Sequence, residues 1–395
     1  MKATKFTLHH AVLLGAVLGL GLLALNLGWT FGGGGRSPIG ASKTAAPSLE
    51  TESTTLPEPL SNPPRKADHG QMLMGLEKCW EKLSQGTTPD QAQELIAEIT
   101  AMLWTADPTQ VGAAIRAFLD SGRDAPTGLP FQVGEKCLAS SPTLRVALLD
   151  LLERLDMGEA ADYARLVVDA MKEADEVAVA LRTLMHLPEE DERRALAASG
   201  VERLLHREDW KAKPSGGYLE AFDVATETEQ PAIWKRLLGL TADTTAFPGT
   251  QQAAALAAHT LAVRSPEFRA LIADRDSPLS VSPVIRGQLM ARLDPRIPTE
   301  LAALNAFVTD VRMTSEEAQA FAANFPSQRD LVGFRLITNT AARIRPIEDA
   351  AKLDIAAEVL VRRWSLANLA GEMTPLIAKL VIRLDQIAKS AQHAL

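Results

Sequence analysis

Metal binding is the first chemistry that the histidines and carboxylates of this sequence suggest. His206 and Asp209 lie three residues apart, so on a helix they would face the same side and could share a metal ion. A zinc site needs three or four ligands, and the sequence contains no His-Glu-x-x-His or paired Cys-x-x-Cys motif to supply the others. We therefore expect a solvated helix end here and assign no metal ligand, cofactor or catalytic residue from the sequence.

The two cysteines, Cys79 and Cys137, have two interpretations. In an oxidising compartment they could form a disulfide that closes a long loop and stabilises the fold by about 4 kcal/mol in the chain-entropy model. Each cysteine also has apolar neighbours on a predicted helix and could be a buried thiol. The sequence leaves both interpretations open.

A glycine-rich stretch from Phe31 to Thr44, FGGGGRSPIGASKT, nearly spells a phosphate-binding loop. In such a loop the Lys and the hydroxyl residue directly follow the last glycine, but Ala41 and Ser42 separate Gly40 from Lys43. The buried strand and the helix that should flank the loop are also missing from the pattern. We predict that Lys43 is a solvated charge in a flexible tether.

Signatures of two classes of envelope enzyme are missing as well. Some lytic transglycosylases combine a helical superhelix with a lysozyme-like domain whose catalytic Glu precedes Ser, and the only Glu-Ser pair here, Glu52-Ser53, lies in the tether. No Gly-x-Ser-x-Gly elbow indicates an acyl hydrolase. The acidic run from Glu189 to Glu192 is better explained as the first turn of a helix, where carboxylates complement the helix dipole.

An apolar run from Ala11 to Trp29 contains no ionisable residue and reaches roughly 28 Å as a helix, close to the thickness of a bilayer core. Lys2 and Lys5 precede this run, and the first charge after it is Arg36. The positive-inside tendency then places the N-terminus in the cytoplasm and the rest of the chain outside.

These observations predict a short cytoplasmic segment (1–10) and a single-pass signal-anchor helix (11–31) in a bacterial-type inner membrane. The alternative is a cleaved signal peptide and a secreted protein. Residues 32–69 are rich in Gly, Pro, Ser and Thr, so we expect a disordered linker. The remainder, 70–395, is the predicted extracytoplasmic, periplasmic domain.

The charge of this domain argues against nucleic-acid binding. The chain has 41 Lys and Arg against 49 Asp and Glu, and residues 1–69 contain 6 and 4 of these. The domain therefore has 35 basic and 45 acidic residues and a net charge of −10. A nucleic-acid surface would need clustered positive charge.

Helical periodicity dominates the domain. The segments 88–105 and 141–155 place apolar residues at helical spacing, and long alternating β patterns are absent from the sequence. Residues 372–392 carry an apolar stripe that is wide enough to pack into the domain, although a narrower stripe could form a dimer. We predict an all-α fold.

A recurring phrase, Ser-Pro followed by two residues and Arg, marks the starts of several predicted helices. It occurs at residues 141–145, 265–269 and 282–286, with a weaker version at 325–329. Three further prolines open similar segments: Pro108, Pro231 and Pro346. A capping residue before a first-turn proline is a helix-start signal.

Helices of about 10 to 20 residues joined by short turns resemble HEAT-like or tetratricopeptide-like α-solenoids, and residues 141–155 look most like one helix of a HEAT unit. The starts are unevenly spaced, and the Trp, Gly and Tyr positions of the tetratricopeptide consensus are missing. The structural alternative is an irregular helical bundle.

A helical array on an anchor and tether predicts an interaction protein that binds another protein or a peptide, because stacked helices form extended concave surfaces. The alternative is a cell-envelope enzyme that acts on glycan or peptide with a site assembled from residues distant in sequence. A purely structural spacer is a third reading.

Overall fold

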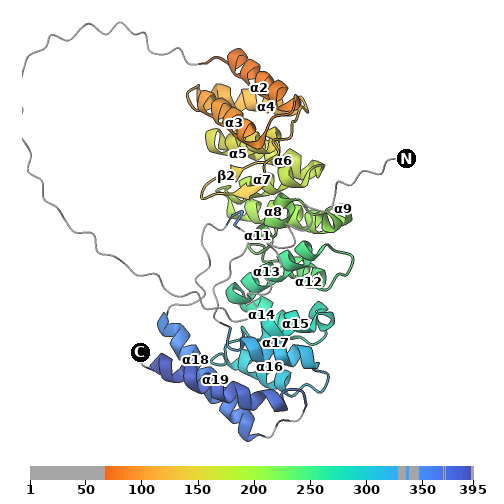
Figure 1. The fold of residues 1–395 in the computed structure, drawn as a ribbon, viewed down its shortest axis with the longest axis vertical. Helices are drawn as coiled ribbons and strands as arrows, with labels where there is room; N and C mark the ends of the chain where they lie inside the picture. Colours follow the sequence, from red (N-terminus) through yellow and green to blue (C-terminus); the bar gives the residue numbers. More distant parts are fainter. Residues whose placement is uncertain (1–66, 328–334, 338–346, 368, 370, 393–395) are drawn as a thin grey trace, which may run out of the picture. The chain divides into compact units, whose positions relative to one another are not determined.

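The computed structural model describes residues 67–327, 335–337, 347–367, 369 and 371–392. These residues belong to one compact unit. Nearly all of its regular elements are helices, which confirms the predicted all-α class (Figure 1). None of the helices described is both long and apolar enough to cross a membrane. The predicted signal-anchor helix (11–31) and residues 32–66 of the predicted linker lie outside the described residues.

The first half of the unit consists of ten helices and one small hairpin. In chain order these elements are α2 (His69–Ser84), α3 (Pro89–Trp104), α4 (Pro108–Asp120), β1 (Gln132–Val133), β2 (Leu138–Ser140), α5 (Leu144–Leu155), α6 (Met157–Ala170), α7 (Ala174–Met185), α8 (Glu190–Leu205), α9 (Glu208–Ala212), α10 (Gly216–Glu220) and α11 (Phe222–Ala225). The antiparallel hairpin of β1 and β2 was not predicted.

The second half contains eight α-helices and one 3₁₀ turn within the described residues. They are α12 (Pro231–Leu240), α13 (Pro248–Arg264), α14 (Pro266–Ala273), η1 (Pro278–Val281), α15 (Pro283–Met290), α16 (Pro298–Val308), α17 (Ser315–Asn324), α18 (Ile347–Leu366) and α19 (Thr374–Gln392). Packing partners are mostly close in chain order, as for α6 with α7, α12 with α13, and α15 with α17.

Prolines begin helices at most of the predicted sites that the structure describes, but the predicted side-chain cap forms at only some of them, since Ser282 and Gln230 accept no capping hydrogen bond. Thr88 caps α3 through a capping box with Gln91, which confirms the predicted helix in residues 88–105. The Ser265 side chain accepts the Phe268 N–H, and Pro266 and Pro283 begin α14 and α15. Pro108 and Pro231 likewise open α4 and α12.

Three boundaries differ from the prediction. At residues 141–145, Thr143 rather than Ser141 is the N-cap of α5, because the Pro142 carbonyl accepts the Thr127 N–H and holds the preceding residues in a loop. Phe325 ends α17, so Pro326 begins no helix up to residue 327, and Pro346 lies outside the described residues. His69, assigned to the linker, is the first residue of α2, because Asp68 and Gln71 form a capping box there.

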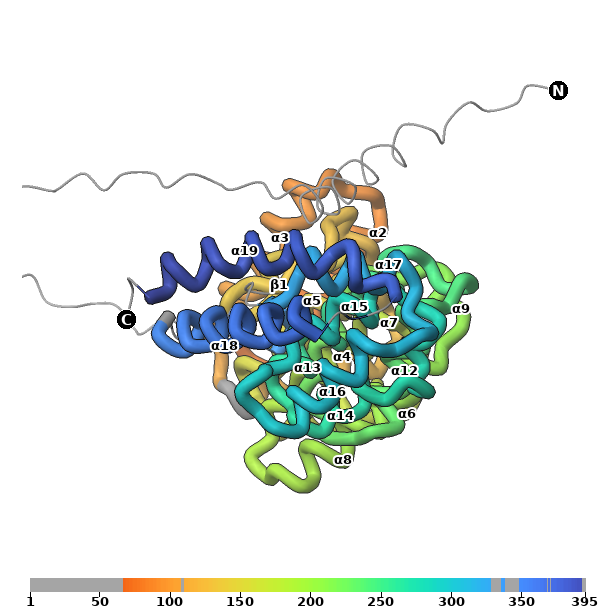
Figure 2. Tube along the Cα trace, turned by 90° about the horizontal axis from the view of Figure 1, so that it is seen from below, coloured from red at the N-terminus to blue at the C-terminus, as the bar shows by residue number. Residues whose placement is uncertain are grey.

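The last two helices lie side by side in both views (Figures 1 and 2). The stripe of α19 is buried at Ile377, Leu380, Leu384 and Ala388, and α19 packs against both α18 and α17. The apolar side chains of this stripe therefore contribute to the core of their own unit.

The arginine of the recurring phrase has a consistent partner. Arg145 Nε lies 2.6 Å from Glu176 Oε1, and Arg269 Nε lies 2.7 Å from Glu300 Oε1. Arg286 forms the corresponding ion pair with Glu317. In each pair the glutamate follows the arginine by 31 residues.

All three glutamates occupy the third position of their helices: α7, α16 and α17. A carboxylate in the first turn also complements the helix dipole. The arginines reach backwards as well, since Arg145 Nη1 donates to the Leu119 carbonyl at 2.6 Å and Arg269 Nη1 donates to the Ala262 carbonyl at 3.1 Å. Each of these two arginines therefore connects the last turn of an earlier helix with the first turn of a later one.

Candidate functional site

A pair of carboxylates at the junction of α10 and α11 binds the backbone of a distant segment. Glu220 Oε2 accepts the Arg335 N–H at 2.9 Å, and Asp223 Oδ2 accepts the Ile337 N–H at 2.9 Å. The donors and acceptors are 115 and 114 residues apart in the chain. This contact joins segments far apart in sequence, whereas most helices of the unit pack against near neighbours.

Local sequence explains why the junction has this form. Ser215 caps α10 by accepting the Tyr218 N–H. The Gly217 N–H donates to Asp175 Oδ1 at 2.7 Å, and a Cβ atom at Gly217 would lie only 2.5 Å from the same oxygen. Glycine is required for this close approach of α10 to Asp175. The approach fixes the short helix on which Glu220 lies.

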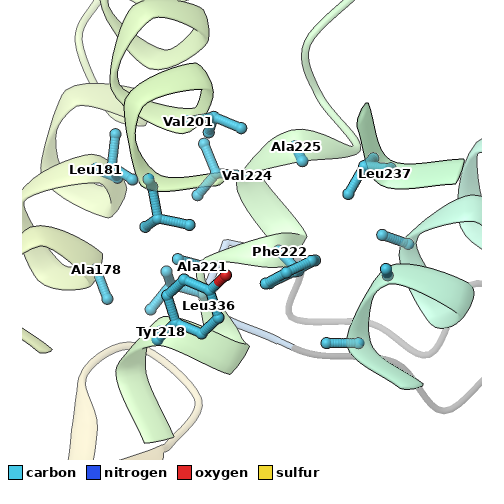
Figure 3. Packing of buried hydrophobic residues seen from close by; sticks show 14 of the residues in the cluster. Ala178, Leu181, Val201, Tyr218, Ala221, Phe222, Val224, Ala225, Leu237 and Leu336 are labelled. Atoms are coloured by element: carbon cyan, nitrogen blue, oxygen red, sulfur yellow. The ribbon is translucent and has the colours of Figure 1, made fainter. Parts of the chain in front are cut away.

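Leu336, between the two donor residues, anchors the segment. Its side chain is 3% exposed and belongs to the same apolar cluster as Tyr218, Ala221 and Phe222 (Figure 3). Full burial of a leucine side chain stabilises by about 1.5–3 kcal/mol, and a hydrogen bond to a charged group adds at most about 1.5–3 kcal/mol. Leu336 thus occupies an apolar contact site at α10 and α11 that has two acceptors for backbone N–H groups at its edge, and we call this site the α10–α11 pocket.

The electrostatics of this pocket favour a donor over an anion. Burial raises the pKa of Glu220, as does the nearby negative charge of Asp223, while the Arg335 N–H and the charge of Arg335 oppose this rise. The Tyr218 hydroxyl is buried and has no hydrogen-bond partner within the described part of the chain. Burial raises the pKa of that hydroxyl, so it is a neutral donor and acceptor at neutral pH. The hydroxyl therefore has unused capacity to donate and to accept a hydrogen bond.

The residues singled out in the sequence as metal-ligand candidates do not converge. His206 is the C-cap of α8, and its Nδ1 lies 2.7 Å from the Glu202 carbonyl oxygen. Asp209 is exposed and binds the Arg207 guanidinium through both oxygens, at 2.9 and 2.6 Å. No group of three or more potential metal ligands occurs among the residues described.

The cysteines are free thiols in this structure. Cys79 is buried on α2, and burial together with the nearby Glu98 raises the pKa of its thiol to about 11, while Lys82 opposes that rise. Cys137 is partly exposed just before β2. The disulfide between Cys79 and Cys137 stays a prediction, to be tested by non-reducing mass spectrometry of the purified protein.

A buried charged cluster between α5 and α7 is a second place where ionisable groups meet. Arg182 Nη2 lies 2.7 Å from Asp150 Oδ1 and 2.8 Å from Glu153 Oε2, and His186 Nδ1 lies 2.5 Å from Glu153 Oε1. Asp150 also accepts the Leu138 N–H at 2.8 Å, which ties the β hairpin to α5. Burial opposes ionisation of Glu153, yet His186 and Arg182 together lower its pKa. The cluster is satisfied internally, which is typical of a structural role.

His259 and Arg292 form a third polar contact. Arg292 Nε donates to His259 Nδ1 at 2.8 Å, and Arg292 Nη1 has no partner among the described residues. Burial and the adjacent guanidinium lower the pKa of His259 to about 3, and burial lowers the pKa of Arg292 to about 10. A separate hollow of about 410 Å³ between α18 and α19 is lined mainly by small and apolar side chains. Neither place combines a pocket with converging reactive groups.

The sequence did not single out Glu220 and Asp223. The available signal was weak: two carboxylates three residues apart, shortly after a Gly-Gly-Tyr-Leu sequence. Their partner segment lies far along the chain, and no periodicity connects the two.

Comparison of the chain with models of protein families, with curated proteins and with solved structures gives no match.

Proposed function

We propose that this protein is a membrane-anchored interaction protein whose extracytoplasmic helical domain binds another protein or a peptide. The α10–α11 pocket carries this proposal, because Glu220 and Asp223 accept backbone N–H groups while a leucine fills the adjacent apolar site. Backbone recognition combined with one side-chain pocket is a common way to bind extended peptides.

The proposed architecture is an α-solenoid-like array of HEAT-like or tetratricopeptide-like character in residues 70–395. Three ion pairs support it, since Arg145, Arg269 and Arg286 each pair with a glutamate 31 residues later. Equivalent contacts at a constant separation are expected when similar helical units are stacked. The short helices α9, α10 and α11 favour the alternative, an irregular helical bundle.

The proposed location is the inner membrane of a bacterial-type envelope. The anchor is the apolar segment 11–31, residues 1–10 are cytoplasmic, and the linker 32–69 holds the domain on the periplasmic side. A secreted protein after signal cleavage is the alternative. A reporter fused to the C-terminus should be digested by protease added to intact spheroplasts; digestion only after lysis would contradict this orientation.

The test of partner binding uses the full chain in detergent-solubilised membranes. Affinity capture with the wild-type protein should recover a protein in stoichiometric amount, and Glu220→Gln/Asp223→Asn should reduce its recovery. Glu348→Gln, which alters an exposed ion pair with Lys352, is the matched control and should leave recovery unchanged. The proposal fails if no stoichiometric protein is recovered, or if the double variant recovers it as well as wild type.

The rival function is a cell-envelope enzyme acting on glycan or peptide. The observation that favours it is the raised pKa of Glu220 beside Asp223, because a carboxyl group that stays protonated to higher pH can serve as a general acid. Mass spectrometry of peptidoglycan incubated with the purified protein would detect released fragments. Turnover by the wild type and its loss in Glu220→Gln, with a folded variant, would favour the enzyme.

A further inference from the structure

We propose that Arg335, Leu336 and Ile337 act as an internal ligand of the α10–α11 pocket, with which the peptide of a partner must compete. This inference rests on the proposed function of that pocket as a peptide-binding surface. It adds a regulatory contact and a definition of the partner: an extended segment with an aliphatic side chain between two free backbone N–H groups, preceded by a basic residue.

The first argument is the nature of the contact. Within the described residues, the contact consists of two backbone N–H groups, the buried Leu336 side chain and the half-buried Ile337 side chain. Backbone N–H groups are common to all residues except proline, so another peptide can reproduce these hydrogen bonds. The polar contacts are therefore transferable to a partner, unlike a contact that depends on paired side chains of unusual type.

The second argument is the charge around the pocket. Glu220 and Asp223 place two carboxylates beside the segment, and the Arg335 charge opposes the rise in the pKa of Glu220 that burial causes. Arg335 itself is exposed, so its guanidinium faces solvent near the carboxylates rather than filling the core. A partner with Lys or Arg before the aliphatic residue would gain the same attraction, and one with Asp or Glu there would be disfavoured.

The third argument is a buried hydroxyl group beside the segment that has no hydrogen-bond partner within the described part of the chain. The Tyr218 hydroxyl is buried in the same cluster as Leu336 but has no partner within the described part of the chain. A buried polar group without a partner is unfavourable. A peptide that supplied a carbonyl or a donor to this hydroxyl would satisfy a group that the internal segment leaves unsatisfied.

Covalent connection gives the internal segment its advantage, since a tethered ligand has a high effective concentration at its site. Weakening the internal contact should therefore raise the apparent affinity for a peptide added from solution. The probe is a fluorescent peptide with the sequence of residues 333–339, Gly-Phe-Arg-Leu-Ile-Thr-Asn. Binding is measured by fluorescence anisotropy with the full chain in detergent micelles.

Leu336→Ala should bind the probe at least tenfold more tightly than the wild type does. A probe methylated at the backbone nitrogens of its Arg and second aliphatic residue, which removes both N–H donors, should lose most of this binding. A probe with Asp in place of the central Leu should lose it as well. Ile337→Pro, which removes one internal N–H and retains Leu336, provides a second way to weaken the contact and should give the same gain.

Equal affinity of wild type and the two variants for the probe would overturn the proposal, as would equal binding of the methylated probe. Circular dichroism identifies a variant that does not fold, and the other variant then decides. These outcomes are separable from those of the proposed function. If capture recovers a partner but the variants leave probe binding unchanged, the internal-ligand proposal is wrong and the proposed function stands. If the variants bind the probe more tightly but no partner is captured, the internal-ligand proposal stands and the proposed function is wrong.

Discussion

Two sets of glutamates in this unit differ in what neutralises them. Glu176, Glu300 and Glu317 are buried and pair with arginines at a constant separation of 31 residues. Glu220 instead meets a backbone N–H and the like charge of Asp223. The first arrangement fixes helices to one another, because removing either partner leaves a buried charge. In the proposed function the second exchanges one backbone for another, and this would be the physical difference between a structural contact and a recognition contact.

Breaking a structural pair should have the largest effect. Glu317 contacts both Arg275 and Arg286, and its side chain is 1% exposed. Glu317→Gln removes the carboxylate that pairs with the buried Arg286 guanidinium, while Arg275 keeps its ion pair with Asp310, and should lower the free energy of unfolding by about 3–5 kcal/mol. Urea denaturation followed by circular dichroism measures this loss. A decrease below about 1 kcal/mol would show that these pairs do not hold the helices together.

Weakening the recognition contact should have a smaller and more local effect. Leu336→Ala removes a buried aliphatic side chain, which costs about 2 kcal/mol or more at a buried site. Because the contact is confined to α10 and α11, we expect amide hydrogen exchange at Arg335 and Ile337 to accelerate by about thirtyfold. Exchange in α15 and α17 should remain unchanged. Uniform acceleration across the unit would mean that Leu336 is part of the global core.

The contributions of Glu153 and Glu220 to stability should change with pH in opposite directions. The pKa of Glu153 is lowered, so its contribution to stability is present above pH 4.5 and is lost as the pH falls through its folded-state pKa. The pKa of Glu220 is raised, so its ionisation reduces stability as the pH rises above 4.5. The Glu153→Gln variant should therefore lose most stability, relative to wild type, at neutral pH. The free energy of unfolding of Glu220→Gln, relative to wild type, should be most favourable at neutral pH. Urea denaturation between pH 3.5 and 7 distinguishes the two; parallel curves would contradict the assignment.

The smallest effect is expected for an exposed ion pair between a glutamate and a lysine. Glu348 and Lys352 lie one turn apart on α18, with their side chains 70% and 54% exposed. Solvent and salt screen such a pair. Glu348→Gln should give a denaturation curve that coincides with that of the wild type. A clear shift would show that exposure does not separate structural from dispensable ion pairs here.

Local sequence patterns predicted much of the helical content. The Thr88 start of α3 and the acidic first turn of α8 were predictable, because caps and first-turn carboxylates act on groups within a few residues. The start of α5 was misplaced by two residues, because the Pro142 carbonyl accepts the Thr127 N–H from a preceding loop. The β1–β2 hairpin was missed for a similar reason: its strands are too short to show alternation.

The candidate site was beyond the reach of such patterns. The recurring arginines marked helix starts in the sequence, but nothing local indicated that Arg145, Arg269 and Arg286 would each meet a glutamate 31 residues later. Glu220 and Asp223 look like ordinary surface carboxylates until Leu336 is placed beside them.

The sequence by itself determined the helical class and several of the helix starts, because these depend on hydrogen bonds and apolar spacing within one or two turns. Only the tertiary structure decided which charges are paired and which carboxylates bind a distant backbone, because those contacts depend on how helices pack across 31 to 115 residues of chain.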